Sequence, residues 1–292
     1  MIILSQLLTQ GSSVTLPLNG GWQPNSPYLT AILGAGRGCT LRAVGPIAGI
    51  WLPLRGRLQL FSGDMEFLLL PKELRVTELD ANTSAIGCGQ ALWVAILGAR
   101  EAWRNALHGM MDIPTPEPLL LPARYSADRP VMRQAIALAR SIHDSPSVAA
   151  CNAIIESVIA RQSGFADAIA RCPGRTLARR RQVFSRLQRA RNYIAANSHL
   201  DPDIHTLARM ASYTPWHFIR AFRTTYQETP HAYLVSQRLQ HARRLLRSPL
   251  AIKEIAVASG FANRSAFSRL FRERFGATPG ALRRQSNYVA SL

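Results

Sequence analysis

A repeated stretch near the C-terminus decides the fold of this 292-residue chain. One copy spans Ile255–Pro279 and reads IAVASGFANRSAFSRLFRERFGATP; the other spans Leu207–Pro230 and reads LARMASYTPWHFIRAFRTTYQETP. The copies match at an offset of 48 residues before an internal turn and 49 after it, so that Phe222 corresponds to Phe271. Such self-similarity predicts one structural unit that is used twice.

Each copy has the pattern of a short helix, a tight turn and a second helix. Asp201-Pro202-Asp203 supplies a cap, a helix-starting proline and an acid before the first short helix, and Thr214-Pro215 starts the helix that follows it. Gly260 lies at the turn of the second copy, where a left-handed backbone costs little only for glycine. The repeat therefore predicts two helix-turn-helix units.

A helical run over Ala232–Arg247 connects the two units, with leucines on one side and arginines interspersed. At 1.5 Å per residue this run is about 24 Å long. Successive major-groove faces on one side of B-DNA are about 34 Å apart. A linker helix of this length predicts that a monomer can read two adjacent groove segments.

The two second helices carry the candidate binding residues. Phenylalanines four residues apart mark the buried face of each helix, and the opposite face is polar and rich in arginine. Such a face fits the major groove, where Arg grips guanine, Ser bonds to either partner and apolar groups meet the thymine methyl. The alternative is that these are ordinary solvated positions, which two matched copies disfavour. The candidate DNA-binding residues are Trp216, Ile219, Arg220, Arg223, Arg264, Ser265, Ser268, Arg269 and Arg272.

Basic charge is concentrated in the same part of the chain. From Arg175 onward there are 21 Lys and Arg against 5 Asp and Glu, whereas residues 1–174 hold 14 against 12. This distribution attracts a polyanion by counterion release. A further basic run precedes the repeat, and its arginines can be phosphate contacts or solvated charge: Arg179, Arg180, Arg181, Arg186, Arg189 and Arg191.

The segment from about Ser185 to Arg284 resembles the DNA-binding domain of the AraC/XylS family of bacterial transcription regulators. The resemblance rests on Gly260-Phe261, on the run Phe267–Arg272 and on Phe275–Pro279, together with Ile255-Ala256. It covers about a third of the chain. It implies a seven-helix domain whose two second helices enter adjacent major grooves, and it places all the candidates except Arg223 and Arg272 on DNA-contacting positions.

Two residues depart from the family pattern. Gln227 stands where the first copy usually ends its helix with glycine, which leaves the end of that helix open. Ile219 stands at a position that is often polar, which implies weaker hydrogen-bond reading by the first unit.

The rest of the chain has another pattern. In residues 1–112, short apolar runs broken by Gly and Pro predict strands, with Gly49–Leu54 and Leu58–Phe61 as two of them. The resemblance implies a cupin-like β-barrel there, for an effector or for dimerisation. Residues 113–174 are expected to hold a Pro-rich connector and two helices that close the β domain or form a subunit contact, and residues 175–292 hold the DNA-binding domain. The predicted fold class is α+β, with flanking helices on the barrel and an all-α C-terminal domain.

Several classes of function are excluded by composition. The first histidine is His108, so residues 1–107 lack the histidines of a cupin metal centre, and no nucleophile-base pair or phosphate loop indicates an enzyme. We expect no cofactor, no metal and no catalytic residue. The uncharged stretch Ala81–Ala99 is too polar for a membrane helix, and a cytoplasmic protein is expected.

The sequence thus predicts a sequence-specific transcription regulator, an activator, that binds double-stranded promoter DNA. A small-molecule effector, a contact with RNA polymerase and a homodimer stay open, and no membrane partner is expected. The alternatives are a nonspecific architectural DNA-binding protein and a repressor without an effector.

Overall fold

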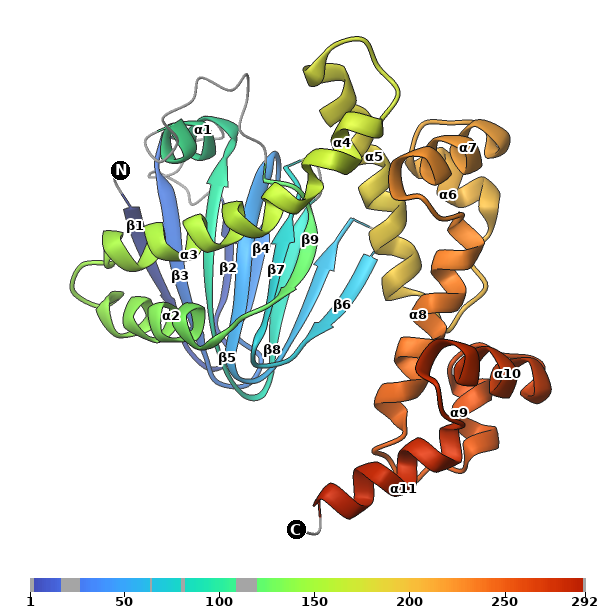
Figure 1. Ribbon diagram of the computed structural model, residues 1–292. Helices are drawn as coiled ribbons and strands as arrows, with labels where there is room; N and C mark the ends of the chain where they lie inside the picture. The colour runs from blue at the N-terminus through green and yellow to red at the C-terminus, as the bar shows by residue number, and fades with distance from the viewer. Residues whose placement is uncertain (1–2, 17–26, 64, 80–81, 109–119, 291–292) are drawn as a thin grey trace. The chain divides into compact units, whose positions relative to one another are not determined.

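A computed structural model describes residues 3–16, 27–63, 65–79, 82–108 and 120–290. The chain divides into two compact units (Figure 1). The first comprises Met1–Ala170 with Thr176–Ala178, and the second comprises Arg171–Arg175 with Arg179–Leu292.

The first unit is built on one nine-stranded sheet. The main path through it runs β1-β3-β8-β5-β7-β9, while β2 and β4 pair with each other beside β8, and β6 pairs with β5. The strands are β1 (Ile3–Leu8), β2 (Ser13–Leu16), β3 (Leu29–Ala35), β4 (Thr40–Ala43), β5 (Ile47–Ser62), β6 (Met65–Leu69), β7 (Glu73–Thr77), β8 (Thr83–Ala99) and β9 (Ala123–Ser126).

The predicted β-rich domain is confirmed, but its predicted closure into a barrel is wrong. In the described part of the chain the sheet is open, with β1 and β9 at the two ends of its main path. The stretch Leu54–Arg57, expected as a break between two strands, lies inside β5. The register between β5 and β8 shifts there, and Gly56 adopts a φ of 71°. A bulge of this kind bends a long strand without ending it.

Two buried tryptophans lie close together on the sheet. Trp51 and Trp93 are both completely buried, with ring centroids 6.0 Å apart. The Trp51 indole donates to the Thr77 hydroxyl at 3.0 Å, and the Trp93 indole donates to the Cys39 sulfur at 3.3 Å. A Cβ on Gly34 would lie 2.1 Å from the Trp93 ring, so glycine is needed for this close approach.

Helices cover one face of the sheet, as Figure 1 shows for α2 (Arg129–Ser141) and α3 (Val148–Gln162). Their buried residues share one core with the sheet and with α1 (Arg100–His108). A short 3-10 turn (Ser163–Phe165) and α4 (Ala166–Arg171) follow. Of the two roles considered for the helical pair, the structure shows core packing. No helix in the described ranges is long and apolar enough to span a bilayer.

The second unit is helical. It contains most of α5 and all of α6 to α11, the seven helices that the family resemblance implies. They are α5 (Leu177–Ala196), α6 (Ile204–Met210), α7 (Pro215–Tyr226), α8 (Pro230–Leu245), α9 (Ile252–Ala258), α10 (Arg264–Phe275) and α11 (Pro279–Ala290). The helix-turn-helix pairs are α6–α7 and α9–α10, and α8 is the connecting helix that the sequence predicts.

Both pairs have the same core. Phe218 and Phe222 on α7 are completely buried with ring centroids 5.6 Å apart, and Phe267 and Phe271 on α10 repeat that arrangement at 5.6 Å. Burial of these rings fixes the rotation of each helix about its axis.

Residues with a left-handed backbone conformation lie at matching positions in the two copies. Gln227 ends α7 with a φ of 60°, and Gly276 ends α10 with a φ of 73°, so the first helix ends where the second does although it lacks the glycine. Gly260, with a φ of 83°, is at the turn of the second unit as predicted, and Ser212, with a φ of 57°, is at the turn of the first.

Alanine at two of these glycines should separate backbone strain from steric conflict. A Cβ on Gly276 meets nothing within 4 Å, so Gly276→Ala should cost about 1 kcal/mol from the left-handed backbone alone. A Cβ on Gly260 would lie 2.9 Å from the His199 carbonyl oxygen, so Gly260→Ala should cost about 2–4 kcal/mol.

Hydrogen exchange of the α9 and α10 amides in the full chain measures both costs. Gly280→Ala, where the backbone is helical and the nearest atom is 3.9 Å away, is the control and should change little. Equal effects of Gly260→Ala and Gly276→Ala would contradict the steric part of the argument.

Candidate nucleic-acid interface

Capping residues fix where α7 and α10, the helices that carry the candidate residues, begin. The Asn263 side chain accepts hydrogen bonds from the Ser265 amide at 2.8 Å and the Ala266 amide at 3.1 Å, so α10 begins at Arg264. Sequence analysis did not single out Asn263, although Asn directly before an apolar-periodic run is a start signal. In the first unit the Thr214 hydroxyl contacts His217 Nδ1 at 2.7 Å, and Pro215 opens α7.

The preceding short helix is capped in turn. The Asp203 carboxylate accepts from the Thr206 amide at 2.9 Å, and the hydrogen bonds from Thr206 and His205 lower the pKa of Asp203. A capped α6 gives the Phe residues of α7 a fixed surface to pack on.

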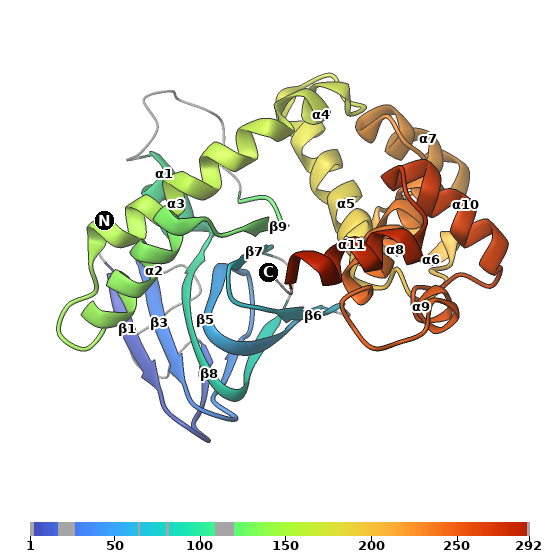
Figure 2. The ribbon, with the colours of Figure 1, turned by 60° about the horizontal axis from the view of Figure 1, so that its bottom comes forward.

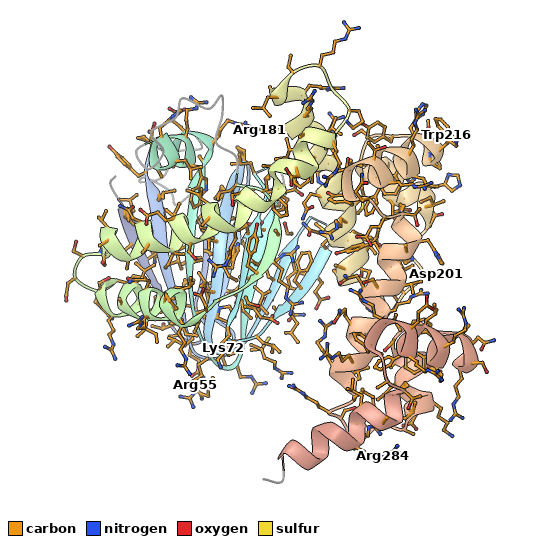
Figure 3. All side chains as sticks on the ribbon, viewed as in Figure 1. Arg55, Lys72, Arg181, Asp201, Trp216 and Arg284 are labelled. Atoms are coloured by element: carbon orange, nitrogen blue, oxygen red, sulfur yellow. The ribbon has the colours of Figure 1, made fainter. Side chains whose placement is uncertain are left out.

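All nine candidate residues lie on the solvent side of their helices. Eight are exposed and Ser268 is half-buried. The exposed fraction reaches 62% for Trp216, whose side chain projects outward in Figure 3, and 40% for Ile219. Both side chains are therefore accessible to a partner, next to the exposed arginines of α7.

The two faces match position by position. The offset of 49 residues pairs Arg220 with Arg269 and Arg223 with Arg272. It also pairs Trp216 with Ser265 and Ile219 with Ser268. The shared arginines give both helices a cationic face, whereas the first helix has apolar groups where the second has hydroxyls.

Neighbouring side chains make only weak contacts with these exposed arginines. The Arg220 guanidinium carbon lies 5.4 Å from the centroid of the Trp216 ring. Arg269 lies 3.7 Å from the Glu273 carboxylate, with both side chains about 70% exposed. An exposed pair of this kind contributes little, so its arginine is available to another partner.

The helices that carry these faces lie on the same side of the second unit. In Figure 1 and in the turned view of Figure 2, α7 and α10 project to one side of α8, near its two ends. The two helices that carry the exposed arginines therefore lie on one side of the connecting helix.

Comparison with known proteins assigns the second unit to a family. A model described as a helix-turn-helix domain matches residues 207–285. The regulatory protein SoxS of Escherichia coli K12 is 33% identical over 90 residues, which are 30% of this chain and 84% of SoxS. The chain belongs to the AraC family of transcription regulators.

Two further transcription regulators are similar to about a third of the chain. The regulator GlxA of Rhizobium meliloti is 44% identical over 93 residues, 29% of this chain and 26% of GlxA, so the match spans about a quarter of that relative. The solved DNA-binding domain of AdpA, in complex with a target DNA, is 31% identical and covers 36% of this chain and 95% of the domain, with a TM-score of 0.33.

Other arginines of this AraC-type domain have internal partners. Arg238 on α8 donates from Nε to the Ser198 carbonyl at 2.8 Å and from Nη2 to the Leu200 carbonyl at 2.7 Å. Arg283 on α11 donates to the Leu246 carbonyl at 3.2 Å and to the Leu250 carbonyl at 2.7 Å. Each arginine donates to carbonyl groups at or just after the C-terminal end of an earlier helix. Carbonyls there have no hydrogen-bond partner within that helix.

The basic run before the repeat is also partly internal. The Arg191 guanidinium lies 4.8 Å from the Tyr226 ring, 4.3 Å from the Tyr233 ring and 3.7 Å from the Glu228 carboxylate. Arg180 donates to the Gly174 carbonyl at 2.9 Å. Arg191 and Arg180 therefore contact other residues of the second unit. The sequence predicted only phosphate contacts or solvated charge for them.

Glutamine substitutions should separate structural from surface arginines. Arg238→Gln loses one part-buried and one exposed charge-assisted hydrogen bond to carbonyls and should lower the stability of the second unit by about 1.5–3 kcal/mol. Arg269→Gln removes an exposed side chain and should change it by less than about 0.5 kcal/mol. Hydrogen exchange across α8 and α9 measures both, and an undisturbed Arg238→Gln protein would show that these hydrogen bonds are dispensable.

Proposed function

We propose that this AraC-family protein is a sequence-specific activator of transcription that inserts α7 and α10 into adjacent major-groove segments of promoter DNA. The observation that carries the proposal is the pair of matched helices, α7 and α10, which lie on one side of α8 and whose candidate arginines are exposed. The surplus of basic residues in this half supplies the attraction to phosphates.

The two helices read different chemistry. Arg264, Arg269 and Ser265 on α10 offer donors to guanine and to other base edges. Trp216 and Ile219 on α7 offer apolar surface, which suits the C5 methyl of thymine. We therefore expect an asymmetric site, with a methyl-rich segment under α7 and a guanine-containing segment under α10.

Two alternatives make different predictions. A nonspecific architectural protein would bind scrambled and promoter DNA alike, whereas specific binding should exceed nonspecific binding by about 10³-fold or more. A repressor without an effector would bind the same DNA but lower transcription when its gene is expressed. RNA polymerase contact and a homodimer are compatible with activation, and neither is required for the proposed reading geometry.

Genome-wide footprinting should first identify the site, and variants should then test the reading role of α10. Arg264→Ala or Arg269→Ala should cost about 1–3 kcal/mol of binding and relax base preference at one position. The measurement is a binding titration against the site and its single-base variants, repeated over a salt series.

Arg274→Ala is the matched control, because Arg274 is an exposed arginine of α10 that lies away from the reading face. It should leave base preference unchanged. Retained specificity in both Arg264→Ala and Arg269→Ala would remove α10 from base reading.

Deoxyuridine tests the methyl contacts of α7. Replacing thymines under α7 by deoxyuridine removes only the methyl groups and should weaken binding by about threefold to tenfold, since burial of one such group contributes about 0.8 kcal/mol. Ile219→Ser, which copies the matching residue Ser268, should lose this sensitivity. The same replacement under α10 should have a smaller effect, and equal sensitivity of both halves would refute the asymmetric site.

A further inference from the structure

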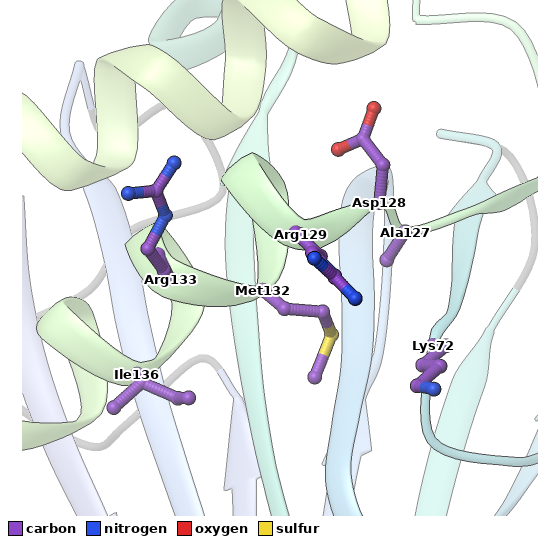
Figure 4. Close-up of a pocket in the computed structure, with 7 residues that line it drawn as sticks. All are labelled: Lys72, Ala127, Asp128, Arg129, Met132, Arg133 and Ile136. Atoms are coloured by element: carbon purple, nitrogen blue, oxygen red, sulfur yellow. The ribbon is translucent and has the colours of Figure 1, made fainter.

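A groove on the first unit lies outside the tryptophan-filled core of the sheet. It is formed between α2 and the turn from β6 to β7, and its volume is about 840 Å³ (Figure 4). Pockets that hold small molecules occupy about 300–1,000 Å³. Its lining residues are Lys72, Ala127, Asp128, Arg129, Met132, Arg133 and Ile136.

One face of α2 supplies most of this lining. Arg129, Met132, Arg133 and Ile136 are spaced at i, i+3, i+4 and i+7, which places them on one stripe of the helix. The core-facing residues of α2 form a different stripe. The groove stripe therefore alternates cationic and apolar side chains, and 41% of Ile136 is exposed to solvent.

The carboxylate among the lining residues, Asp128, pairs with an arginine outside the lining. Asp128 accepts from the Val131 amide at 3.2 Å and pairs with Arg161 at 2.7 Å. Glu73, next to Lys72 in the sequence, pairs with Arg124 and accepts from the Leu70 amide at 3.0 Å. Within the described ranges, Lys72, Arg129 and Arg133 form no ion pair.

Lys72 is held at the rim of the groove by an unusual backbone. Its φ is 71°, a region that favours glycine, and its carbonyl accepts from the Ala127 amide at 2.8 Å. Non-glycine residues in this region are strained and tend to occur at functional sites. Figure 4 shows Lys72 on the side of the groove toward which Arg129 extends, whereas Arg133 lies beyond Met132 and points away from Lys72.

We propose that this groove binds a small amphipathic anion, a carboxylate or phosphate ester with an aliphatic or aromatic tail. Arg129 and Lys72 bind the anionic head, Arg133 adds positive charge on the same stripe of α2, and Met132 and Ile136 contact the tail. The proposal gives the first unit a ligand-binding role that goes beyond DNA recognition. A DNA backbone is a poorer occupant, because its phosphates would leave the apolar floor without a partner.

Calorimetric titration of the full chain with octanoate, in the absence of DNA, tests the proposal. Octanol has a similar tail without the charge, and acetate and inorganic phosphate supply the charge without the tail. Octanoate should bind with a dissociation constant of about 0.1–1 mM, as its size allows, and the three comparison compounds should bind at least about tenfold more weakly.

Variants locate the binding. The double substitution Arg129→Gln and Arg133→Gln should weaken octanoate binding by about tenfold or more, and Ile136→Ser by about threefold. Arg140→Gln, on the same helix but outside the groove lining, should change it by less than about twofold. All four positions are exposed, so hydrogen exchange of α2 should confirm that the variants fold normally.

Three results would overturn the proposal: no heat with octanoate at millimolar concentration, octanol or phosphate binding as tightly as octanoate, or an equal loss in Arg140→Gln. A loss of DNA affinity in the double variant with no octanoate binding in the wild type would assign the groove to the DNA backbone instead. Since octanoate is titrated without DNA, failure here leaves the proposed DNA-binding function untouched.

Discussion

The geometry of the DNA-binding half depends on the burial of two pairs of phenylalanines. Phe218 and Phe222 on α7, and Phe267 and Phe271 on α10, pack inward and fix the rotation of each helix. The opposite face must then point to solvent, and its residues become available for recognition. A change that turned either helix by one residue would move its arginines by about 100° and remove them from the common surface.

The second unit was largely predictable because its signals are local and occur twice. Caps, turn glycine and the spacing of Phe residues each specify structure within a few residues, and the matched copies confirm one another. Gln227 is an exception, because it adopts the left-handed conformation without being glycine, as Gly276 is at the matching position. The packing that both units share therefore determines where the helix ends, and Gln227 accepts the backbone strain.

The first unit was less predictable because long-range pairing decides it. Arg55-Gly56-Arg57 has the composition of a turn, yet β8 pairs on both sides of it and keeps β5 continuous. In the same way, Arg238 resembles the surface arginines around it, and only the fold shows that it reaches carbonyls about 40 residues earlier in the chain. The exposed faces of α7 and α10 needed no such information, since helical periodicity alone places them.

Under the proposed function, the unlike residues at matched positions of α7 and α10 have a consequence for how the domain is oriented on DNA. If both helices offered the same side chains, both would prefer the same bases. Trp216 and Ile219 against Ser265 and Ser268 remove that equivalence. In the proposed reading, an exchange of the two half-sites would then place each helix over the wrong bases.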